Sequence, residues 1–253
     1  MMYIPVRCID CGKCVEVCPE GALSMDRDNK VDWDKCTFCL KCVEACRQDA
    51  MRRAGEEISA EELYRIIEED RIFYGTSGGG VTLSGGEPLS QPDFITEIFR
   101  LCRRGSIHTA LDTSGLGNSE DLVKVLKYVD LVLLDIKQMD PIEHIKWTGV
   151  SNDVILKNAR IMAEKCEVRI SLPLVSGVNN SRRNIEQMAE FAKELGIKAI
   201  DVEPLHKLAS QKYKFLGMES PFEDLEKVSD EEVEEIREIF HSYGLVTTKG
   251  RDF

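Results

Sequence analysis

The sequence has no excess of positive charge. Its 253 residues include 45 Asp and Glu but only 33 Lys and Arg, which gives a net charge of −12 at pH 7. Nucleic acids and anionic membranes attract positively charged surfaces and repel negatively charged ones. We therefore expect neither a nucleic acid nor a membrane among the partners of this protein.

Long hydrophobic runs and export signals are also missing. No stretch approaches the roughly 20 apolar residues that cross a bilayer as a helix, and no signal peptide precedes Cys8. Proteins that stay inside the cell keep their cysteines reduced. We therefore expect a cytoplasmic protein that works in a reducing, anaerobic cell.

Cysteine, in contrast, is abundant near the N-terminus. Two quartets share the spacing C-x2-C-x2-C-x3-C at an offset of 28 residues: Cys8, Cys11, Cys14 and Cys18, then Cys36, Cys39, Cys42 and Cys46. This spacing is typical of bacterial ferredoxins with two [4Fe–4S] clusters, in which the fourth cysteine of each run binds the other cluster. The predicted ligands are Cys8, Cys11, Cys14 and Cys46 for one cluster and Cys36, Cys39, Cys42 and Cys18 for the other.

The cysteines allow two other interpretations. A disulfide framework needs an oxidising compartment, and nothing in the sequence exports the chain. Structural zinc sites use pairs of CxxC knuckles and have no use for a third cysteine two residues further on. The two-cluster interpretation is therefore favoured. Because the cysteine-rich segment is too small to bury much of a core, its clusters would hold it together.

The rest of the chain alternates strands and helices. The predicted helices span 59–74, 91–103, 119–128, 152–165 and 182–195, and the predicted strands span 81–84, 107–112, 130–136, 167–174 and 199–202. Strands joined by helices of this length form a parallel sheet, and five units in series favour a barrel-like (β/α) arrangement. We expect a cluster module at residues 1–54 and an α/β domain at residues 55–253.

The segment 219–240 carries ten acidic and two basic residues. It could serve as an acidic docking surface or simply form a solvated helix. A capping box of Ser229 and Glu232, followed by an apolar stripe of Val233, Ile236 and Phe240, favours the helix.

Polar residues and glycines gather where the predicted strands end. They are Gly85, Gly86, Glu87, Asp112, Thr113, Asp135, Lys137, Asn179 and His206, with Arg169 inside its strand. Ligands of parallel α/β folds bind at the carboxyl ends of the strands. The two glycines let a ligand approach the backbone, and Glu87 could hold an ammonium group. Asp112 and Asp135 could converge on a cation or a hydroxyl group, and Lys137 and Arg169 could neutralise a carboxylate.

These motifs resemble the glycyl-radical enzyme activating enzymes of the radical S-adenosylmethionine (SAM) superfamily. The resemblance covers the whole chain, and a two-cluster insert is typical of the larger members of this family. It is carried by TSGGGVTLSGGEPLSQPDF at 76–94, ALDTSG at 110–115, LLDIKQMD at 133–140, RISLPLVSGVNN at 169–180 and EPLHKLASQKYKFLG at 203–217.

The resemblance implies a fold, a reaction and a set of roles. The fold would be a partial (β/α) radical SAM barrel lacking its first strand, with an N-terminal ferredoxin-like module. SAM would be cleaved reductively to methionine and a 5′-deoxyadenosyl radical, which removes a hydrogen atom from a glycine of a partner enzyme. Flavodoxin or ferredoxin would supply the electrons. Gly85, Gly86 and Glu87 would hold the SAM amino group, Asp112, Thr113 and Asp135 a monovalent cation, and Lys137, Arg169 and His206 the methionyl or ribose part.

One feature of the family is absent from the sequence. A CxxxCxxC loop normally holds a third [4Fe–4S] cluster, which binds and reduces SAM, and no such loop occurs here, so no catalytic cysteine can be named. Cys102 and Cys166 are interpreted as core residues. We expect the recorded start to be an internal Met of a longer activating enzyme, since the downstream motifs are intact and a lost first strand would leave an unprotected sheet edge. Genuine loss of the catalytic cluster is the competing explanation.

Two other functions compete with the activating enzyme. One is a non-catalytic electron carrier, a two-cluster ferredoxin fused to a degenerate barrel. The other is a different radical SAM enzyme that acts on a small molecule. A carrier would hold two clusters and ignore SAM, whereas the activating enzyme would hold three and consume it.

Overall fold

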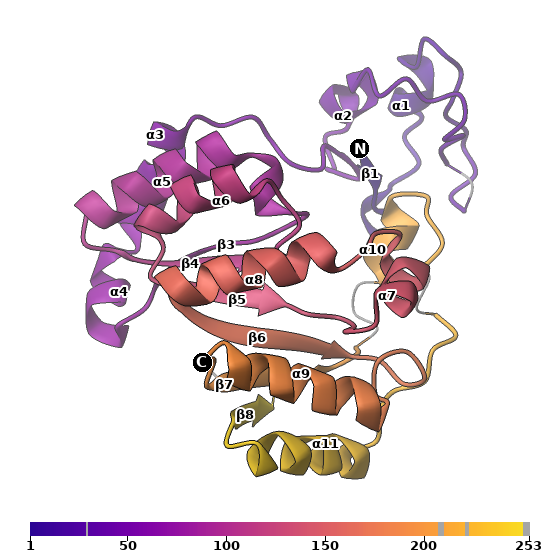
Figure 1. Ribbon diagram of the computed structural model, residues 1–253. Coiled ribbons are helices and arrows are strands. Elements are labelled where there is room, and N and C mark those ends of the chain that lie inside the picture. Colours follow the sequence, from indigo (N-terminus) through magenta and orange to yellow (C-terminus); the bar gives the residue numbers. More distant parts are fainter. Residues whose placement is uncertain (29, 207–209, 221–222, 250–253) are drawn as a thin grey trace. The chain divides into compact units, whose positions relative to one another are not determined.

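The computed structural model describes residues 1–28, 30–206, 210–220 and 223–249. The chain divides into two compact units, which are described separately (Figure 1). The first unit comprises Met1–Glu57 and His206–Leu225, and the second comprises Ile58–Leu205 and Glu226–Phe253. The strand-and-helix pattern of the sequence gave no sign that residues 206–225 return to the first unit. The predicted boundary between residues 54 and 55 stays a prediction.

The first unit is built from short elements. Its helices are α1 Lys13–Glu16, α2 Lys41–Ala45 and α10 Ser210–Phe215, and its strands are β1 Met2–Tyr3 and β2 Met51–Arg52. The two strands pair antiparallel, and the 3-10 helix η1 Pro5–Arg7 follows β1. The first residues of the chain therefore pair with β2, near the end of the segment Met1–Glu57.

The repeat of 28 residues is also present in the structure of this unit. Tyr3 pairs with Met51, and an isolated antiparallel bridge joins Leu23 to Val31. Tyr3 and Val31 are 28 residues apart, and so are Leu23 and Met51. The repeat therefore relates the first pair to the second. The two halves of the unit are thus structural repeats of each other.

The second unit contains a six-stranded parallel sheet with its strands in chain order. The strands are β3 Gly80–Leu83, β4 His108–Thr113, β5 Leu131–Asp135, β6 Glu167–Leu174, β7 Ala199–Pro204 and β8 Val246–Lys249. Every adjacent pair is parallel. This arrangement confirms the predicted partial (β/α) barrel, because a barrel sheet also keeps its strands in sequence order.

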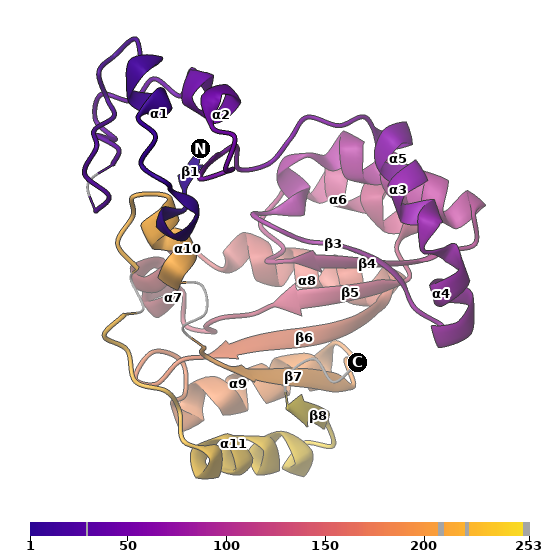
Figure 2. The ribbon, with the colours of Figure 1, turned by 180° about the vertical axis from the view of Figure 1, so that it is seen from behind.

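The helices of the second unit lie mainly on one face of the sheet. They are α3 Ala60–Glu69, α4 Arg71–Ser77, α5 Pro92–Arg104, α6 Ser119–Val125, α7 Pro141–Thr148, α8 Asp153–Lys165, α9 Arg182–Glu194 and α11 Asp230–Ser242, with 3-10 turns η2 Pro88–Ser90 and η3 Leu126–Tyr128. Figure 1 shows α6, α8 and α9 in front of the strands, and Figure 2 shows the opposite face of the sheet. In the described part of this unit, no helix covers that opposite face.

Side chains alternate between the two faces as the pleat requires. Leu134, Ile170 and Ile200 occupy one row across the sheet and are fully buried in the core beneath the helices. The next row contains Asp135, Ser171 and Asp201. The face without helices is therefore polar, as a ligand-binding face of a barrel would be.

Several elements differ from the sequence prediction. The helix expected at 59–74 is broken at Asp70, which ends α3 and precedes α4. Neither α7 nor β8 was expected, because each is short and lacks a clear periodic pattern. Residues 207–209 of the predicted motif 203–217 and residues 221–222 of the acidic segment lie outside the described residues.

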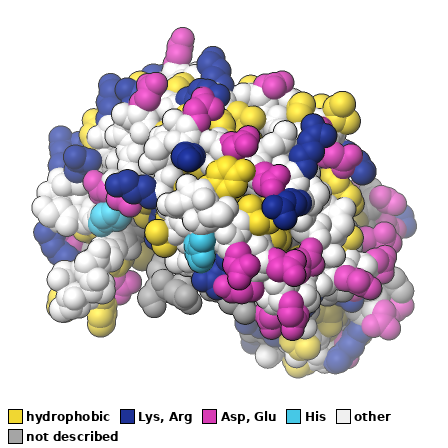
Figure 3. Space-filling view, turned by 60° about the horizontal axis from the view of Figure 1, so that its bottom comes forward, with side chains coloured by type: hydrophobic (Ala, Val, Ile, Leu, Met, Phe, Trp, Pro, Cys, Tyr) yellow, Lys and Arg dark blue, Asp and Glu magenta, His cyan; other side chains and the backbone are white. Residues whose placement is uncertain are grey.

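The acidic segment contains the expected solvated helix. The Ser229 hydroxyl accepts a hydrogen bond from the Glu232 amide at 3.2 Å, and Val233, Ile236 and Phe240 are buried in the core. The acidic side chains on the other side of α11 are exposed, and Figure 3 shows many such side chains on one face of the protein. Among the described helices, none combines the length and apolar character needed to cross a bilayer.

Candidate iron–sulfur sites and cofactor rim

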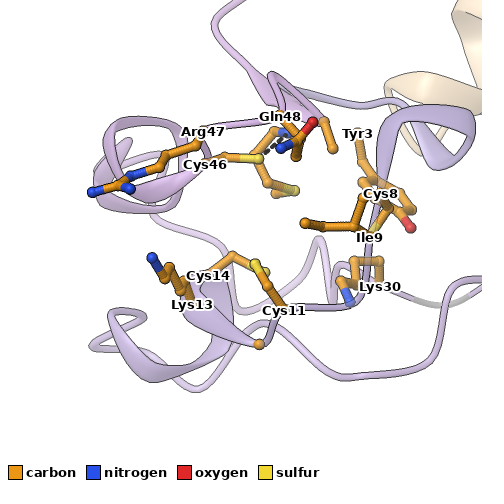
Figure 4. A pocket seen from close by; sticks show the side chains of 13 residues that line it. Tyr3, Cys8, Ile9, Cys11, Lys13, Cys14, Lys30, Cys46, Arg47 and Gln48 are labelled. Atoms are coloured by element: carbon orange, nitrogen blue, oxygen red, sulfur yellow. Dashed lines mark hydrogen bonds between the residues drawn. The ribbon is translucent and has the colours of Figure 1, made fainter.

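The first unit brings the cysteines together in two groups. Cys8, Cys11, Cys14 and Cys46 line a cavity of about 110 Å³, whose side chains are drawn in Figure 4. Cys18, Cys36, Cys39 and Cys42 line a second cavity of about 20 Å³. The fourth cysteine of each run therefore lies with the first three of the other run, which is the grouping that the ferredoxin spacing predicts.

Burial changes the pKa of some of these thiols, and backbone amides donate hydrogen bonds to others. Burial raises the pKa of Cys14 and raises that of Cys42 to about 11. The amide of Ala22 donates to the sulfur of Cys18 at 3.3 Å, and the amide of Met51 donates to that of Cys46 at 3.4 Å. Cysteines bind iron as thiolates, so binding of a cluster has to release the protons that burial retains.

The first cavity also contains buried polar atoms without partners. Lys30 is only 2% exposed, and neither its ammonium nitrogen nor the hydroxyl oxygen of Tyr3 has a hydrogen-bond partner in the described structure. Burying a charge without a partner is costly. A cluster bound by four thiolates is anionic, so the donors in this cavity fit such a group. The cavity therefore suits a [4Fe–4S] cluster in both its ligands and its charge.

In the second unit, Glu87 is fixed by four hydrogen bonds. One carboxylate oxygen accepts from the amide of Leu89 at 3.0 Å and the hydroxyl of Thr113 at 2.5 Å. The other accepts from the amide and the hydroxyl of Ser114, at 2.9 and 2.6 Å. Glu87 therefore ties the loop after β3 to the end of β4.

Gly85 and Gly86 precede this carboxylate on an exposed turn. Their φ angles are 90° and 42°, a left-handed region that favours glycine. A Cβ atom added to either residue would meet nothing within 4 Å. The turn thus presents open backbone at the strand ends, held in place by Glu87.

The neighbouring carboxylates have partners as well. Asp112 accepts a hydrogen bond from the hydroxyl of Ser84 at 3.0 Å, and Asp135 forms an ion pair with Lys137 at 3.0 Å. Thr113 is buried, and its hydroxyl is engaged by Glu87 and by the amide of Gly115. Asp135 is thus the last residue of β5, and Asp112 is the last but one of the adjacent strand β4. The hydroxyl of Thr113, which ends β4, is occupied within the protein.

Arg169 forms a bidentate pair with a residue that the sequence reasoning missed. Its guanidinium donates to both carboxylate oxygens of Asp201, one of them at 3.1 Å. Asp201, which is buried, also accepts a hydrogen bond from the hydroxyl of Thr248. Hydrogen bonding to Asp201 raises the pKa of Arg169. The sequence could have indicated Asp201, because it is an acidic residue inside a predicted strand, two residues before Glu203.

His206 is exposed and belongs to the first unit. Its position relative to Gly85, Asp112 and Arg169 therefore stays a prediction. The preceding residue, Leu205, belongs to the second unit and donates its amide to the carbonyl of Leu174 at 2.9 Å.

Buried amide side chains hold the loops after the strands, and sequence reasoning missed most of them. Asn179, 2% exposed, accepts from the amide of Val175 and donates to the carbonyls of Lys137 and Pro173. Asn158 donates to the carbonyls of Gly115 and Gly117. A polar residue at a helix position spaced for the buried face was the available signal, since Asn158 lies between Ile155 and Met162.

Comparison with protein families gives two matches. A radical SAM superfamily model matches residues 33–201, and a 4Fe-4S dicluster domain model matches residues 7–50. The first covers more than half of the chain. It includes the rim, which is the set of predicted ligand-binding residues at the strand ends, except for His206. The second covers all eight cysteines of the quartets.

Comparison with curated proteins finds activating enzymes. The chain is 42% identical to the trans-4-hydroxy-L-proline dehydratase activating enzyme of Clostridioides difficile, over 99% of this chain and 84% of that protein. It is 39% identical to the choline trimethylamine-lyase activating enzyme of Oleidesulfovibrio alaskensis, over 96% of this chain and 81% of that protein.

Among solved structures, a domain of a pyruvate-formate lyase-activating enzyme from Bacteroides vulgatus is 35% identical. It aligns with a TM-score of 0.58 over 68% of this chain and 99% of that chain. Streptococcus suis SuiB bound to S-adenosylmethionine shares the fold, with a TM-score of 0.61 at 19% identity over 81% of this chain and 46% of that chain.

Proposed function

Since the chain belongs to the radical SAM superfamily, and within it to the glycyl-radical enzyme activating enzymes, we propose that its rim binds SAM through the turn that Glu87 fixes. As a member of this family the protein uses SAM and iron–sulfur clusters, and its protein partner is a glycyl-radical enzyme. The observation that carries the proposal is the set of four hydrogen bonds to Glu87, which fix the exposed Gly85-Gly86 backbone at the strand ends.

The proposed role of Glu87 differs from the one expected from the sequence. The backbone of Gly85 and Gly86 receives the SAM amino group, while Glu87 positions that backbone through Thr113 and Ser114. Its four hydrogen bonds support this role because they occupy both carboxylate oxygens. Lys137, Arg169 and His206 remain the proposed contacts of the methionyl and ribose parts.

A monovalent cation is proposed beside Asp112 and Asp135. Support comes from their places at the ends of adjacent strands, β4 and β5. Thr113, the third predicted ligand, would contribute through its backbone, because its hydroxyl already bonds to Glu87. Carboxylate and carbonyl oxygens are the ligands that hard cations prefer.

Two [4Fe–4S] clusters are proposed in the first unit, one for each group of cysteines. The ligands are Cys8, Cys11, Cys14 and Cys46 for the first cluster and Cys36, Cys39, Cys42 and Cys18 for the second. When bound, the clusters supply one-electron redox chemistry. A flavodoxin or ferredoxin is the proposed donor, and the reducing cytoplasm is the proposed compartment, because thiolate-ligated clusters require reducing conditions.

A third cluster, which would reduce SAM, needs cysteines beyond the two quartets. Cys102 is fully buried on α5, and the thiol of Cys166 faces the carbonyls of Leu126 and Val129, so both behave as core residues. The two curated relatives are longer than their matched regions. We propose that the full-length protein contains a further set of cysteines, which hold the cluster that binds SAM.

The experiment is to purify the protein from its native locus under anaerobic conditions. Its intact mass and N-terminal peptides are determined, its iron is counted, and 5′-deoxyadenosine is measured after reduction with SAM present. Three clusters, a mass above 28.6 kDa and SAM cleavage are expected. A 28.6 kDa protein with two clusters that leaves SAM intact would instead identify an electron carrier.

The role of Glu87 is tested by Glu87→Ala. Loss of its four hydrogen bonds frees the Gly85-Gly86 turn, and we expect SAM to bind at least about tenfold more weakly, about 1.4 kcal/mol. Glu97→Ala, which removes a half-buried carboxylate paired with Arg100 on α5, is the matched control. Equal SAM affinity in both variants, measured by calorimetry, would contradict the proposed turn.

A further inference from the structure

The two cluster cavities differ in charge although they are structural repeats. The described residues lining the first cavity include Lys13, Lys30 and Arg47 and no acidic residue. Those lining the second include Glu20 and no Lys or Arg. Glu20 corresponds to Gln48 of the first cavity under the 28-residue repeat. The repeat is therefore symmetric in its ligands but not in the charge around them.

Of the three cations, Lys30 is the one shielded from solvent. It is 2% exposed, whereas Lys13 and Arg47 are exposed. Water and salt screen an exposed charge strongly and a buried one weakly. In Figure 4, Lys30 lies on the same side of the cavity as Tyr3 and Cys8, opposite Cys46 and Arg47.

Lys30 and the cysteines Cys8, Cys11, Cys14 and Cys46 line the same cavity. The ammonium nitrogen has no hydrogen-bond partner within the described residues. The carboxylate of Asp10 lies within reach of its charge, but that carboxylate forms an ion pair with Arg27 at 2.6 Å. Under the repeat, Lys30 corresponds to Met2, which is uncharged.

We propose that Lys30 acts on one cluster and not on the other. Its ammonium group raises the reduction potential of the cluster held by Cys8, Cys11, Cys14 and Cys46 above that of the other cluster. Reduction adds one negative charge to a cluster, and a buried cation beside it stabilises the reduced form more than the oxidised form. Tyr3 adds a second buried donor to the same cavity, its hydroxyl group. The inference rests on the cluster ligands proposed above.

The test is a redox titration of the full protein, loaded anaerobically with iron and sulfide and reduced with dithionite. Electron paramagnetic resonance follows each reduced cluster, and Cys11→Ser, which alters a ligand of the first cluster, assigns the signals. We expect the higher midpoint to belong to the first cluster. Lys30→Met should change the equilibrium constant for reduction of that cluster at least tenfold, about 59 mV towards lower potential.

Three further variants separate charge from structure. Lys30→Arg keeps the positive charge and should keep most of the potential. Lys13→Met removes an exposed cation from the same cavity and should produce less than half of the Lys30→Met shift. If Lys30→Met fails to load, Lys30→Gln, which keeps a neutral donor, takes its place and should show the same shift.

Each other outcome overturns the inference. Equal midpoints in the unmodified protein, an unchanged first midpoint in a fully loaded Lys30→Met protein, or an equal shift of both midpoints would show that Lys30 does not act on one cluster. Loss of the first cluster from both neutral variants, with retention in Lys30→Arg, would assign Lys30 a purely structural role. Failure of the unmodified protein to load two clusters would contradict the proposed function instead.

Discussion

The two units of this chain are stabilised by different means. In the described part of the first unit, the main apolar cluster has five buried residues, and two of them are Cys14 and Cys42. In the described part of the second unit, the main cluster has thirty buried residues, drawn from both strands and helices. Apolar burial contributes roughly 1.5–3 kcal/mol for each large side chain, so the second unit has an adequate core and the first does not. The first unit therefore depends on its clusters.

The units also differ in how they treat buried polar atoms. In the second unit, the buried amides of Asn158 and Asn179 have their hydrogen bonds satisfied by backbone groups of the strand-end loops. In the first unit, Lys30 and Tyr3 have no such partner. The hydroxyl of Ser171, which is also buried without a partner, lies on the polar face of the sheet. Among the described residues, the buried side-chain atoms without a hydrogen-bond partner therefore lie where a cofactor is proposed.

Removal of iron should have the largest effect and should be confined to one unit. Chelation under anaerobic conditions takes away the ligand bonds that replace a core in the first unit. We expect residues 1–57 to become sensitive to protease while the sheet unit stays resistant. Limited proteolysis with mass spectrometry, before and after chelation, measures this.

The control for this prediction is reloading with iron and sulfide, which should restore resistance. Simultaneous cleavage within the sheet unit would show that the second unit also needs the clusters. The two units would then not be stabilised independently of each other.

A smaller effect is expected from Asn179→Ala in the sheet unit. The change leaves one amide and two carbonyls without their buried partner, and each such group costs about 1–3 kcal/mol. We expect a loss of about 3 kcal/mol in the free energy of unfolding, measured by urea denaturation of the iron-loaded protein.

The matched control is Asn118→Ala at the start of α6. Its side chain accepts from the amides of Glu120 and Asp121 in an exposed setting, and loss of such a cap costs about 1 kcal/mol. Equal losses in the two variants would mean that burial of Asn179 does not matter.

Patterns of spacing made most of this structure predictable. The quartets gave the grouping of the cysteines, because a cluster demands fixed ligand positions. The long helices and strands were found from hydrophobic periodicity. The helix predicted to start at residue 59 has Ser59 as its N-cap, with Glu62 completing a capping box. Short elements such as α7 and β8 were not predicted, because a few residues are too short a stretch for hydrophobic periodicity to distinguish strand, helix and loop.

Pairings between distant residues were not predictable. Nothing local links Arg169 to Asp201 or Glu87 to Thr113, and only the register of neighbouring strands brings them together. For this reason the sequence indicated Glu87 as a ligand for an ammonium group, whereas its oxygens are occupied within the protein. Lys30 was overlooked because a lysine in a polar, cysteine-rich segment usually lies in solvent.

The two units should also differ in the reactivity of their cysteines, which is the smallest effect. Cys102 is fully buried in the second unit, and burial raises the pKa of its thiol from 9.0 to about 11. Cys11 in the first unit is exposed. In iron-free protein at pH 8, iodoacetamide should therefore modify Cys11 readily and leave Cys102 unmodified until urea unfolds the sheet.

The sign of the pH effect follows from the same shift. Below pH 9 the Cys102 thiol is protonated in both the folded and the unfolded chain, so its contribution is complete. Between pH 9 and about 11 only the unfolded chain ionises, and stability falls as the pH rises. Cys102→Ala should remove this part of the pH dependence from the urea midpoint. An unchanged dependence in that variant, or equal labelling of Cys102 and Cys11 in the folded protein, would show that Cys102 is not sealed in the core and that solvent reaches the second unit as it reaches the first.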